Sequence, residues 1–188
     1  MMLDNDTDII IDEHRPIKPI PVEVPPITID VYTDGSAKGN GTSTSVGGWA
    51  FCVVSKGEVI YKSYGSESST TNQRMELTAA AEALDWLVYL LKPRPEDTIT
   101  VFSDSAYLIN CVNQSWWHNW QKNGWRNAKR EPVANQDLWI RLIPYFKCPV
   151  IKWSKVKGHA GDKYNEMVDE MAQKAAEARK HWMEVIDK

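Results

Sequence analysis

The chain has 188 residues, of which 43% are hydrophobic, and a formal net charge of −3 at pH 7. This size and apolar content favour a single folded domain with tails. No run of about 18 apolar residues occurs, and the acidic start Met1–Asp8 lacks the basic and apolar parts of a secretory signal. The sequence therefore argues against membrane insertion and export, and we expect a cytoplasmic protein.

Three cysteines, Cys52, Cys111 and Cys148, are odd in number and show no Cys-x-x-Cys spacing. This pattern argues against a disulfide framework or a zinc site, and favours reduced thiols in the cytosol.

Charge is distributed unevenly along the chain. Residues 1–34 contain eight acids and two bases, whereas residues 116–163 contain ten Lys or Arg and three acids. Such asymmetry predicts an acidic tail and a basic binding surface. The alternative is an ordinary solvated charged face.

Residues 1–26 are acidic and contain five prolines, which disfavour helix and central strand. We expect an arm outside the core, disordered or loosely docked. Its Ile9-Ile10-Ile11 segment could dock on the body or on a partner, and the sequence leaves both open.

Residues 27–34 alternate apolar and polar side chains, which predicts a strand that ends at Asp34. Gly35 and Gly39 then predict a turn. A carboxylate at a strand end can bind a cation or act in acid–base chemistry, although Asp-Gly is also an ordinary turn dipeptide.

Residues 47–54 and 58–64 read as two further strands, and the short connections suggest an antiparallel meander.

A helix is predicted from about Ser68 to Leu91, because Ser, Thr and Asn precede an Ala- and Leu-rich stretch that Pro93 ends. Glu76 shares helical spacing with the apolar residues Ala80, Ala83, Leu87 and Leu90. A glutamate on a buried stripe needs a partner or a metal. The alternative is an exposed acid in the first turn.

Residues 98–104 repeat the first pattern, an alternating strand that ends in Asp104, and a short helix is expected from Ser105 to about Val112. Asp104 could simply cap that helix. Two strands that end in aspartate nevertheless suggest one shared edge of a sheet.

Residues 115–130 interleave tryptophans with Lys122, Arg126, Lys129 and Arg130. Aromatic faces beside cations are typical of grooves that follow a nucleic-acid backbone, although the tryptophans could also pack a small subdomain. A helix with an apolar face is predicted between Pro132 and Pro144.

Residues 149–156 predict a fifth strand, and the glycine-flanked loop 157–161 presents His159. A lone histidine in a loop is more often an ordinary surface residue. The last helix, from Asp162 to about Lys180, places Asn165, Asp169, Ala172 and Ala176 on one side. Asp169 is therefore an acid on a face that packs, unless it is an exposed acid paired with a lysine.

Four acids, Asp34, Glu76, Asp104 and Asp169, are thus candidates for one site. They cannot all stay ionised at close range without cations, and their hard oxygen ligands suit Mg²⁺ or Mn²⁺. Two such ions can activate water and stabilise the leaving oxygen of a phosphodiester. With a basic, tryptophan-rich groove, the pattern predicts a metal-dependent nuclease.

From about Ile27 to about Ala178, the chain resembles type 1 ribonuclease H, the bacterial-like family that cuts the RNA strand of RNA–DNA hybrids. The motifs that carry the resemblance are Tyr32-Thr-Asp-Gly-Ser, Thr70-Thr-Asn-Gln-Arg-Met-Glu-Leu77, Ser103-Asp-Ser, Trp117-His-Asn-Trp-Gln-Lys-Asn-Gly-Trp125, Asn135-Gln-Asp-Leu-Trp139, Val156-Lys-Gly-His-Ala-Gly161 and Asn165-Glu-Met-Val-Asp169. The resemblance implies an α/β fold, a five-stranded mixed sheet flanked by helices, with the first three strands antiparallel.

The resemblance also implies residue roles. Asp34, Glu76, Asp104 and Asp169 would bind two Mg²⁺ ions, for which Mn²⁺ could substitute, and Asp34 would bridge them. His159 would assist proton transfer or product departure. The cut would leave 5′-phosphate and 3′-hydroxyl ends. Contacts to the hybrid would come from Asn40, Thr71, Asn72, Gln73, Arg74, Trp116, Trp120, Lys122, Trp125 and Asn165, with Thr71 and Arg74 near a DNA phosphate and the segment 116–134 forming a basic protrusion.

The expected organisation is an arm (1–26), a catalytic domain (27–178) and a C-terminal tail (179–188), in a chain that acts as a monomer. The arm does not resemble the hybrid-binding domain of many eukaryotic relatives, and the loop after Asn40 lacks the usual proline. Two rival functions stay open: a noncatalytic nucleic-acid-binding module, and a nuclease domain of a larger polymerase or integrase with the same fold.

Overall fold

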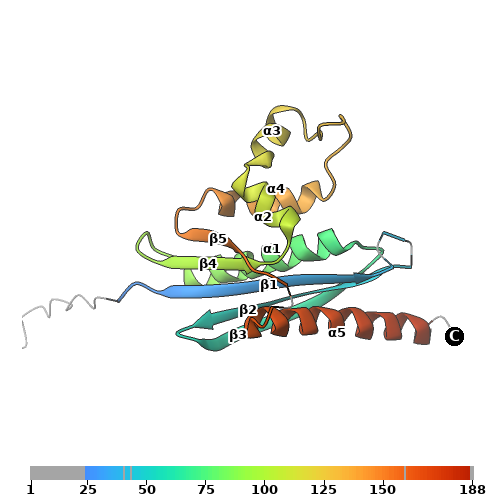
Figure 1. The fold of residues 1–188 in the computed structure, drawn as a ribbon, viewed down its shortest axis with the longest axis horizontal. Helices are drawn as coiled ribbons and strands as arrows, with labels where there is room; N and C mark the ends of the chain where they lie inside the picture. Colours follow the sequence, from blue (N-terminus) through green and yellow to red (C-terminus); the bar gives the residue numbers. More distant parts are fainter. Residues whose placement is uncertain (1–23, 40, 43, 159, 187–188) are drawn as a thin grey trace, which may run out of the picture.

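The computed structural model describes residues 24–39, 41–42, 44–158 and 160–186. Its centre is a five-stranded sheet in the order β3-β2-β1-β4-β5. One side is covered by α1 together with α2 to α4, and the other, among the described residues, by α5 (Figure 1). The elements are β1 (Thr28–Lys38), β2 (Val46–Ser55), β3 (Glu58–Ser68), α1 (Asn72–Leu91), β4 (Thr98–Ser103), α2 (Ala106–Asn113), α3 (Trp116–Lys122), α4 (Gln136–Phe146), β5 (Ile151–Lys155) and α5 (Lys163–Ile186).

The sheet is mixed, which confirms the predicted fold class. The strands β1, β2 and β3 form an antiparallel meander, and β4 and β5 join the other edge of β1 in parallel. Within the described residues no helix is long and apolar enough to cross a membrane.

Alternation along β1 divides the interior into two layers. Ile29 and Val31 belong to the core on the α1 side, whereas Tyr32 packs on the α5 side with Val168 and Ala172. This is the expected behaviour of a strand buried on both faces, since successive side chains point to opposite sides.

The prediction that the first strand ends at Asp34 is wrong. The strand β1 continues to Lys38, and Gly35 and Ser36 pair with Trp49 and Gly48 of β2. The expected turn at Gly35-Ser36 is therefore absent, because β2 offers a pairing partner along this whole stretch. The connection to β2 begins at Gly39, whose φ is +71°.

Three other boundaries differ from the predictions. The strand β3 runs to Ser68, and α5 runs past the predicted helix end at about Lys180 to Ile186. Helix α4 passes through Pro144 and ends at Phe146. The proline removes only the hydrogen bond to the carbonyl of Ile140, a residue that is 51% exposed, so water can replace it.

Helix α1 begins and ends where its local chemistry dictates. The Thr71 hydroxyl accepts a hydrogen bond from the Arg74 backbone N–H (3.1 Å) and caps the amino end. Lys92 takes a left-handed conformation at the other end (φ 42°), just before Pro93.

Two adjacent glycines let helices approach β2 on both faces. A methyl group on Gly48 would lie 2.1 Å from the Ala172 carbonyl oxygen of α5, and one on Gly47 would lie 2.6 Å from the Met75 side chain of α1. The glycine pair therefore fixes the spacing of both layers against the sheet.

We predict that Gly48→Ala lowers the free energy of unfolding by about 3 kcal/mol, because the α5 backbone must move to admit one methyl group. Denaturant unfolding measures this loss. Gly57→Ala is the matched control: Gly57 has φ +80° but no atom within 4 Å of the added carbon, so backbone strain alone should cost about 1 kcal/mol. Equal losses in the two variants would contradict the packing argument.

Candidate active site

Strand register brings Asp34 and Asp104 to the same level of the sheet. In the parallel pair β1–β4, Tyr32 lies opposite Phe102, so two residues further along each chain are Asp34 and Asp104. The strand β4 ends at Ser103, which leaves this part of β1 without a neighbour on that side. Both carboxylates therefore lie at an opening in the sheet where the two layers meet.

Glu76 reaches the same opening because Gly35 has no side chain. A methyl group on Gly35 would lie only 2.2 Å from the Glu76 backbone nitrogen, so the first turns of α1 lie directly against β1. One carboxylate oxygen each from Asp34, Glu76 and Asp104 lies within 4.8 Å of the others. The three acids that the sequence assigned to one site therefore lie close together.

Asp104 does not cap α2, which excludes the simpler interpretation of its position. The cap is Ser105, whose hydroxyl accepts from the Leu108 backbone N–H. The loop after β5 instead passes close to Asp104, since a methyl group on Gly158 would lie 2.6 Å from its Oδ2 atom. His159, the next residue, lies outside the described residues, as does Asn40.

Asp169 approaches the cluster from the opposite layer. It lies on α5, one turn after the buried Asn165, and its Oδ1 accepts a hydrogen bond from the Gln173 amide (2.7 Å). Its charge and a hydrogen bond act on Asp34, although it is not one of the three acids within 4.8 Å. The four predicted acids thus converge, with Asp169 at the margin.

Burial and mutual repulsion disfavour the ionised forms of these acids. Burial, followed by the charges of Asp104 and Asp169, raises the pKa of Asp34 to about 7, although the Gly35 N–H donates to it at 2.7 Å. Burial and the neighbouring carboxylates raise the pKa of Glu76 well above its usual range.

The carboxylate oxygens of this cluster are suitable ligands for a hard divalent cation. The Oε2 atom of Glu76 is buried and has no hydrogen-bond partner. An all-oxygen cluster with an unpartnered buried oxygen is chemically matched to Mg²⁺ or Mn²⁺, which would neutralise the repulsion.

Asn72 connects the cluster to the end of β1. Its side-chain oxygen accepts from the Ala37 backbone N–H (3.1 Å), and its amide donates to Glu76 (3.3 Å). Asn72 and the neighbouring Gln73 are both exposed. They therefore lie at the surface beside the carboxylates, whereas the predicted contact residue Asn165 is only 2% exposed.

Arg74 is held in an ion-pair network that the sequence did not reveal. Its guanidinium donates twice to Asp137 (3.1 and 2.9 Å) and once to Glu67 (2.9 Å). The Asp137 pKa is lowered chiefly by the Arg74 hydrogen bond. A phosphate contact by Arg74 would require exchange of these partners, and Thr71 is already engaged as the helix cap.

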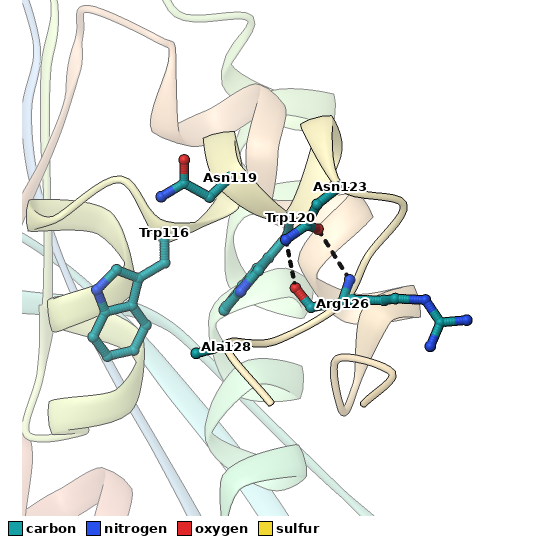
Figure 2. A pocket seen from close by; sticks show the side chains of 6 residues that line it. All are labelled: Trp116, Asn119, Trp120, Asn123, Arg126 and Ala128. Atoms are coloured by element: carbon teal, nitrogen blue, oxygen red, sulfur yellow. Dashed lines mark hydrogen bonds between the residues drawn. The ribbon is translucent and has the colours of Figure 1, made fainter. Parts of the chain in front are cut away.

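Helix α3 and the loop after it form a cleft of about 470 Å³ lined by Trp116, Asn119, Trp120, Asn123, Arg126 and Ala128 (Figure 2). The Asn123 side chain donates to the Arg126 carbonyl (2.9 Å) and accepts from the Arg126 N–H (3.1 Å), which fixes the loop. The cleft combines aromatic faces, amides and a cation, as the sequence pattern predicted for a nucleic-acid groove.

Only some of the tryptophans line this cleft. Trp117 is 5% exposed and belongs to the core, and Trp120 also packs on Trp139 at 5.4 Å between ring centroids. Trp125 packs on Trp120, and Lys122 is exposed at the end of α3. Asn119 and Asn123 were missed, although their spacing of three and seven residues from Trp116 places them on the same helical face.

The family model for RNase H matches residues 27–177. The chain belongs to the RNase H family. A protein named ribonuclease H from Syntrophomonas wolfei is 47% identical over 147 residues, which cover 78% of this chain and 94% of the relative. One from Moorella thermoacetica is 41% identical and covers 80% of this chain and 92% of its own length.

Solved RNase H structures agree with this assignment. LC9-RNase H1, described as a type 1 RNase H with the type 2 active-site motif, has a TM-score of 0.69 at 28% identity, over 83% of this chain and 75% of that one. LC11-RNase H1, solved with an RNA/DNA hybrid, has a TM-score of 0.60 at 20% identity, over 80% and 98%. The second likeness concerns the fold alone.

We predict that the metal-free protein loses stability as the pH rises from about 4 to about 7. The Asp34 pKa is raised from 3.8 to about 7 in the folded chain, so the folded state holds a proton that the unfolded state has released. The loss attributable to Asp34 is on the order of 2–4 kcal/mol. Denaturant unfolding at a series of pH values measures it.

Asp34→Asn provides the control for this pH dependence. It should reduce the loss of stability between pH 4 and 7 without removing it, because burial still raises the pKa of Glu76. Added Mg²⁺ should reduce the loss in the unmodified chain. If Asp34→Asn leaves the dependence of unfolding free energy on pH unchanged, a group other than Asp34 causes that dependence.

Proposed function

We propose that this member of the RNase H family is an endonuclease that hydrolyses the RNA strand of RNA–DNA hybrids. The observation that carries the proposal is the convergence of Asp34, Glu76 and Asp104, with Asp169 beside them, at the opening next to the end of β4. The family match and the relatives named ribonuclease H support the same activity.

In this proposal Asp34, Glu76, Asp104 and Asp169 hold two Mg²⁺ ions, with Mn²⁺ as a substitute. Bound divalent ions of this kind lower the pKa of a water molecule and stabilise the charge on a reacting phosphodiester. We assign Asp34 the central place, because it is the neighbouring charge that acts most strongly on Glu76 and it also interacts with Asp104 and, through a hydrogen bond, with Asp169. The products would carry 5′-phosphate and 3′-hydroxyl ends.

The protein's own groups supply geometry and proton handling. Gly35 sets the approach of α1, Asn72 orients Glu76, and Gln173 orients Asp169 through its amide. The loop that contacts Asp104 through Gly158 carries His159, which we assign to proton transfer or product departure. Asp34, Glu76 and Asp169 are thus oriented before substrate arrives, which reduces the reorganisation that catalysis requires.

Discrimination between RNA and DNA would come from the surface beside the carboxylates. Asn72 and Gln73 are exposed there and can bond 2′-hydroxyl groups, and Asn40 is assigned to the same contact. The cleft of α3, with Lys122 and Arg126 nearby, would take the DNA strand. Its aromatic and cationic lining supports this placement.

Two rival functions fit less well. A noncatalytic binder gains nothing from an acid cluster that repels phosphate. A domain of a polymerase or integrase would share the fold, but the curated relatives described above are named ribonuclease H. The proposal also includes action as a monomer and a cytoplasmic location. The free thiols of Cys52, Cys111 and Cys148 are consistent with a reducing compartment.

We predict that Asp104→Asn reduces Mg²⁺-dependent cleavage of a labelled RNA–DNA hybrid by at least a hundredfold, because the cluster loses one anionic ligand while the shape of the site is kept. Hybrid binding should survive. The same assay on double-stranded RNA and double-stranded DNA should give no cleavage by the unmodified chain. Residual cleavage near the unmodified rate in Asp104→Asn would refute the carboxylate site, and cutting of all three duplexes would indicate a general nuclease.

We also predict that Lys122→Ala combined with Arg126→Ala weakens hybrid binding and reduces the slope of log K against log salt concentration by about 1–2, because up to two phosphate contacts are lost. Fluorescence anisotropy with a labelled hybrid at several salt concentrations measures both. Lys56→Ala, at the β2–β3 turn, removes one cation away from the cleft; it is the control and should change neither. An unchanged slope in the double variant would assign the cleft a structural role.

A further inference from the structure

An apolar groove lies between α5 and the edge strand β3, which run side by side (Figure 1). It encloses about 300 Å³ and is lined by Tyr64, Met171, Lys174, Ala175 and Ala178. Tyr64 is 65% exposed, and Trp182, one turn beyond Ala178, is 53% exposed. Exposed apolar side chains at and beside a groove are a feature of interaction sites.

The groove is separate from the carboxylates. Met171 and Ala178 are about 180–200° around α5 from Asp169, so they project from the opposite side of the helix. The groove also borders the outer edge of β3, with which no strand in the described part of the chain pairs. Proteins usually cover or charge such an edge.

One cation, Lys174, lines this groove, and two others lie near it on the neighbouring elements. Lys62 precedes Tyr64 by two residues and shares its face of β3. Arg179 lies over the Trp182 ring at 5.1 Å and donates to the Ser68 hydroxyl. Lys174 pairs with Glu170, but both are about 70% exposed, and a surface pair of this kind is easily exchanged. An apolar floor with a cationic rim fits a short apolar segment that acids flank.

We propose that residues 8–13 of this same chain, Asp8-Ile9-Ile10-Ile11-Asp12-Glu13, dock in this groove. The three isoleucines match the apolar floor, and the acids on both sides match Lys62, Lys174 and Arg179. These six residues lie outside the described residues. Three observations support their docking: the apolar lining of the groove, the opposite charges of the two partners, and the length of chain between the segment and Val24.

The described chain begins within reach of the groove. Val24 lies in one cleft with Ser55, Lys56 and Gly57, at the turn from which β3 starts. The Tyr164 hydroxyl donates to the Gly57 carbonyl, so α5 starts at the same place. Met171 and Ala178 then lie about 10 and 21 Å along α5 from Tyr164. The 13 residues from Ile11 to Val24 can span about 43 Å, which is sufficient.

Disulfide trapping in the full-length chain tests the proposal. Ile10→Cys is combined with Ala178→Cys in a chain that also carries Cys148→Ser, and oxidising glutathione is added at low protein concentration. We expect an intramolecular disulfide to form at least tenfold faster than in the control pair, Ile10→Cys with Tyr89→Cys. Tyr89 is 80% exposed, and its helix α1 covers the other face of the sheet.

Helix α1 ends near the start of the arm, since Arg94, three residues after Leu91, donates to the carbonyls of Val24 and Pro25. Tyr89 is therefore close enough to the arm to be a stringent control. An arm that docks nowhere would therefore reach Tyr89 as readily as Ala178. Addition of Ile9→Asp and Ile11→Asp to the first pair should reduce its rate to that of the control.

Equal rates for the two pairs would overturn the proposal. Disulfides that form only between two chains, at a rate that rises with concentration, would overturn it in favour of a second copy in the groove. Neither outcome depends on nuclease activity.

Discussion

Repulsion among closely spaced carboxylates is the constraint on which the rest of the structure depends. Asp34, Glu76 and Asp104 are held within 4.8 Å of one another, and burial removes the water that would otherwise screen them. Such a cluster is unfavourable for the folded chain alone. It persists because β1, α1 and β4 are each fixed by packing far larger than the site itself.

Gly35 shows how packing and chemistry are linked at one residue. Its missing side chain allows the backbone of α1 to lie against β1, and this contact brings a helical acid to a strand acid. Gly48 does the same for α5, from which Asp169 approaches. A fold of two helical layers around one sheet thereby places four acids at one opening, and divalent ions are the simplest means of offsetting their charge.

Much of this could be predicted from the sequence, because the patterns were strong. Alternation gave the strands, the Ala- and Leu-rich stretch gave α1, and an acid on its apolar stripe indicated a buried Glu76. The error at Gly35 has a clear cause: glycine was interpreted as a turn residue, whereas here it serves close packing within a strand. Sequence patterns cannot distinguish these two uses, since the distinction depends on a helix 40 residues later.

Other features could not be predicted from the sequence, because they depend on contacts between distant residues. The ion pair of Arg74 with Asp137 joins residues 63 positions apart, and its pair with Glu67 joins the end of β3 to α1. Asn165 was assigned to the substrate by resemblance, while its helical spacing with Ala172 and Ala176 placed it on the side of α5 that packs. Its exposure of 2% agrees with the spacing. The sequence predicted aromatic and cationic side chains in this segment, while the lining of the cleft at α3 depends on the helix phase and on the path of the following loop.

The most direct test of the central claim is calorimetric titration of Mn²⁺ into the protein at pH 7 in two buffers with different ionisation enthalpies. If cations relieve carboxylate repulsion, saturable binding should release on the order of one proton per chain, because the ions displace protons that Asp34 and Glu76 hold. The Asp34→Asn variant should bind more weakly and release fewer protons. Binding without proton release, or binding that Asp34→Asn leaves unchanged, would contradict the account.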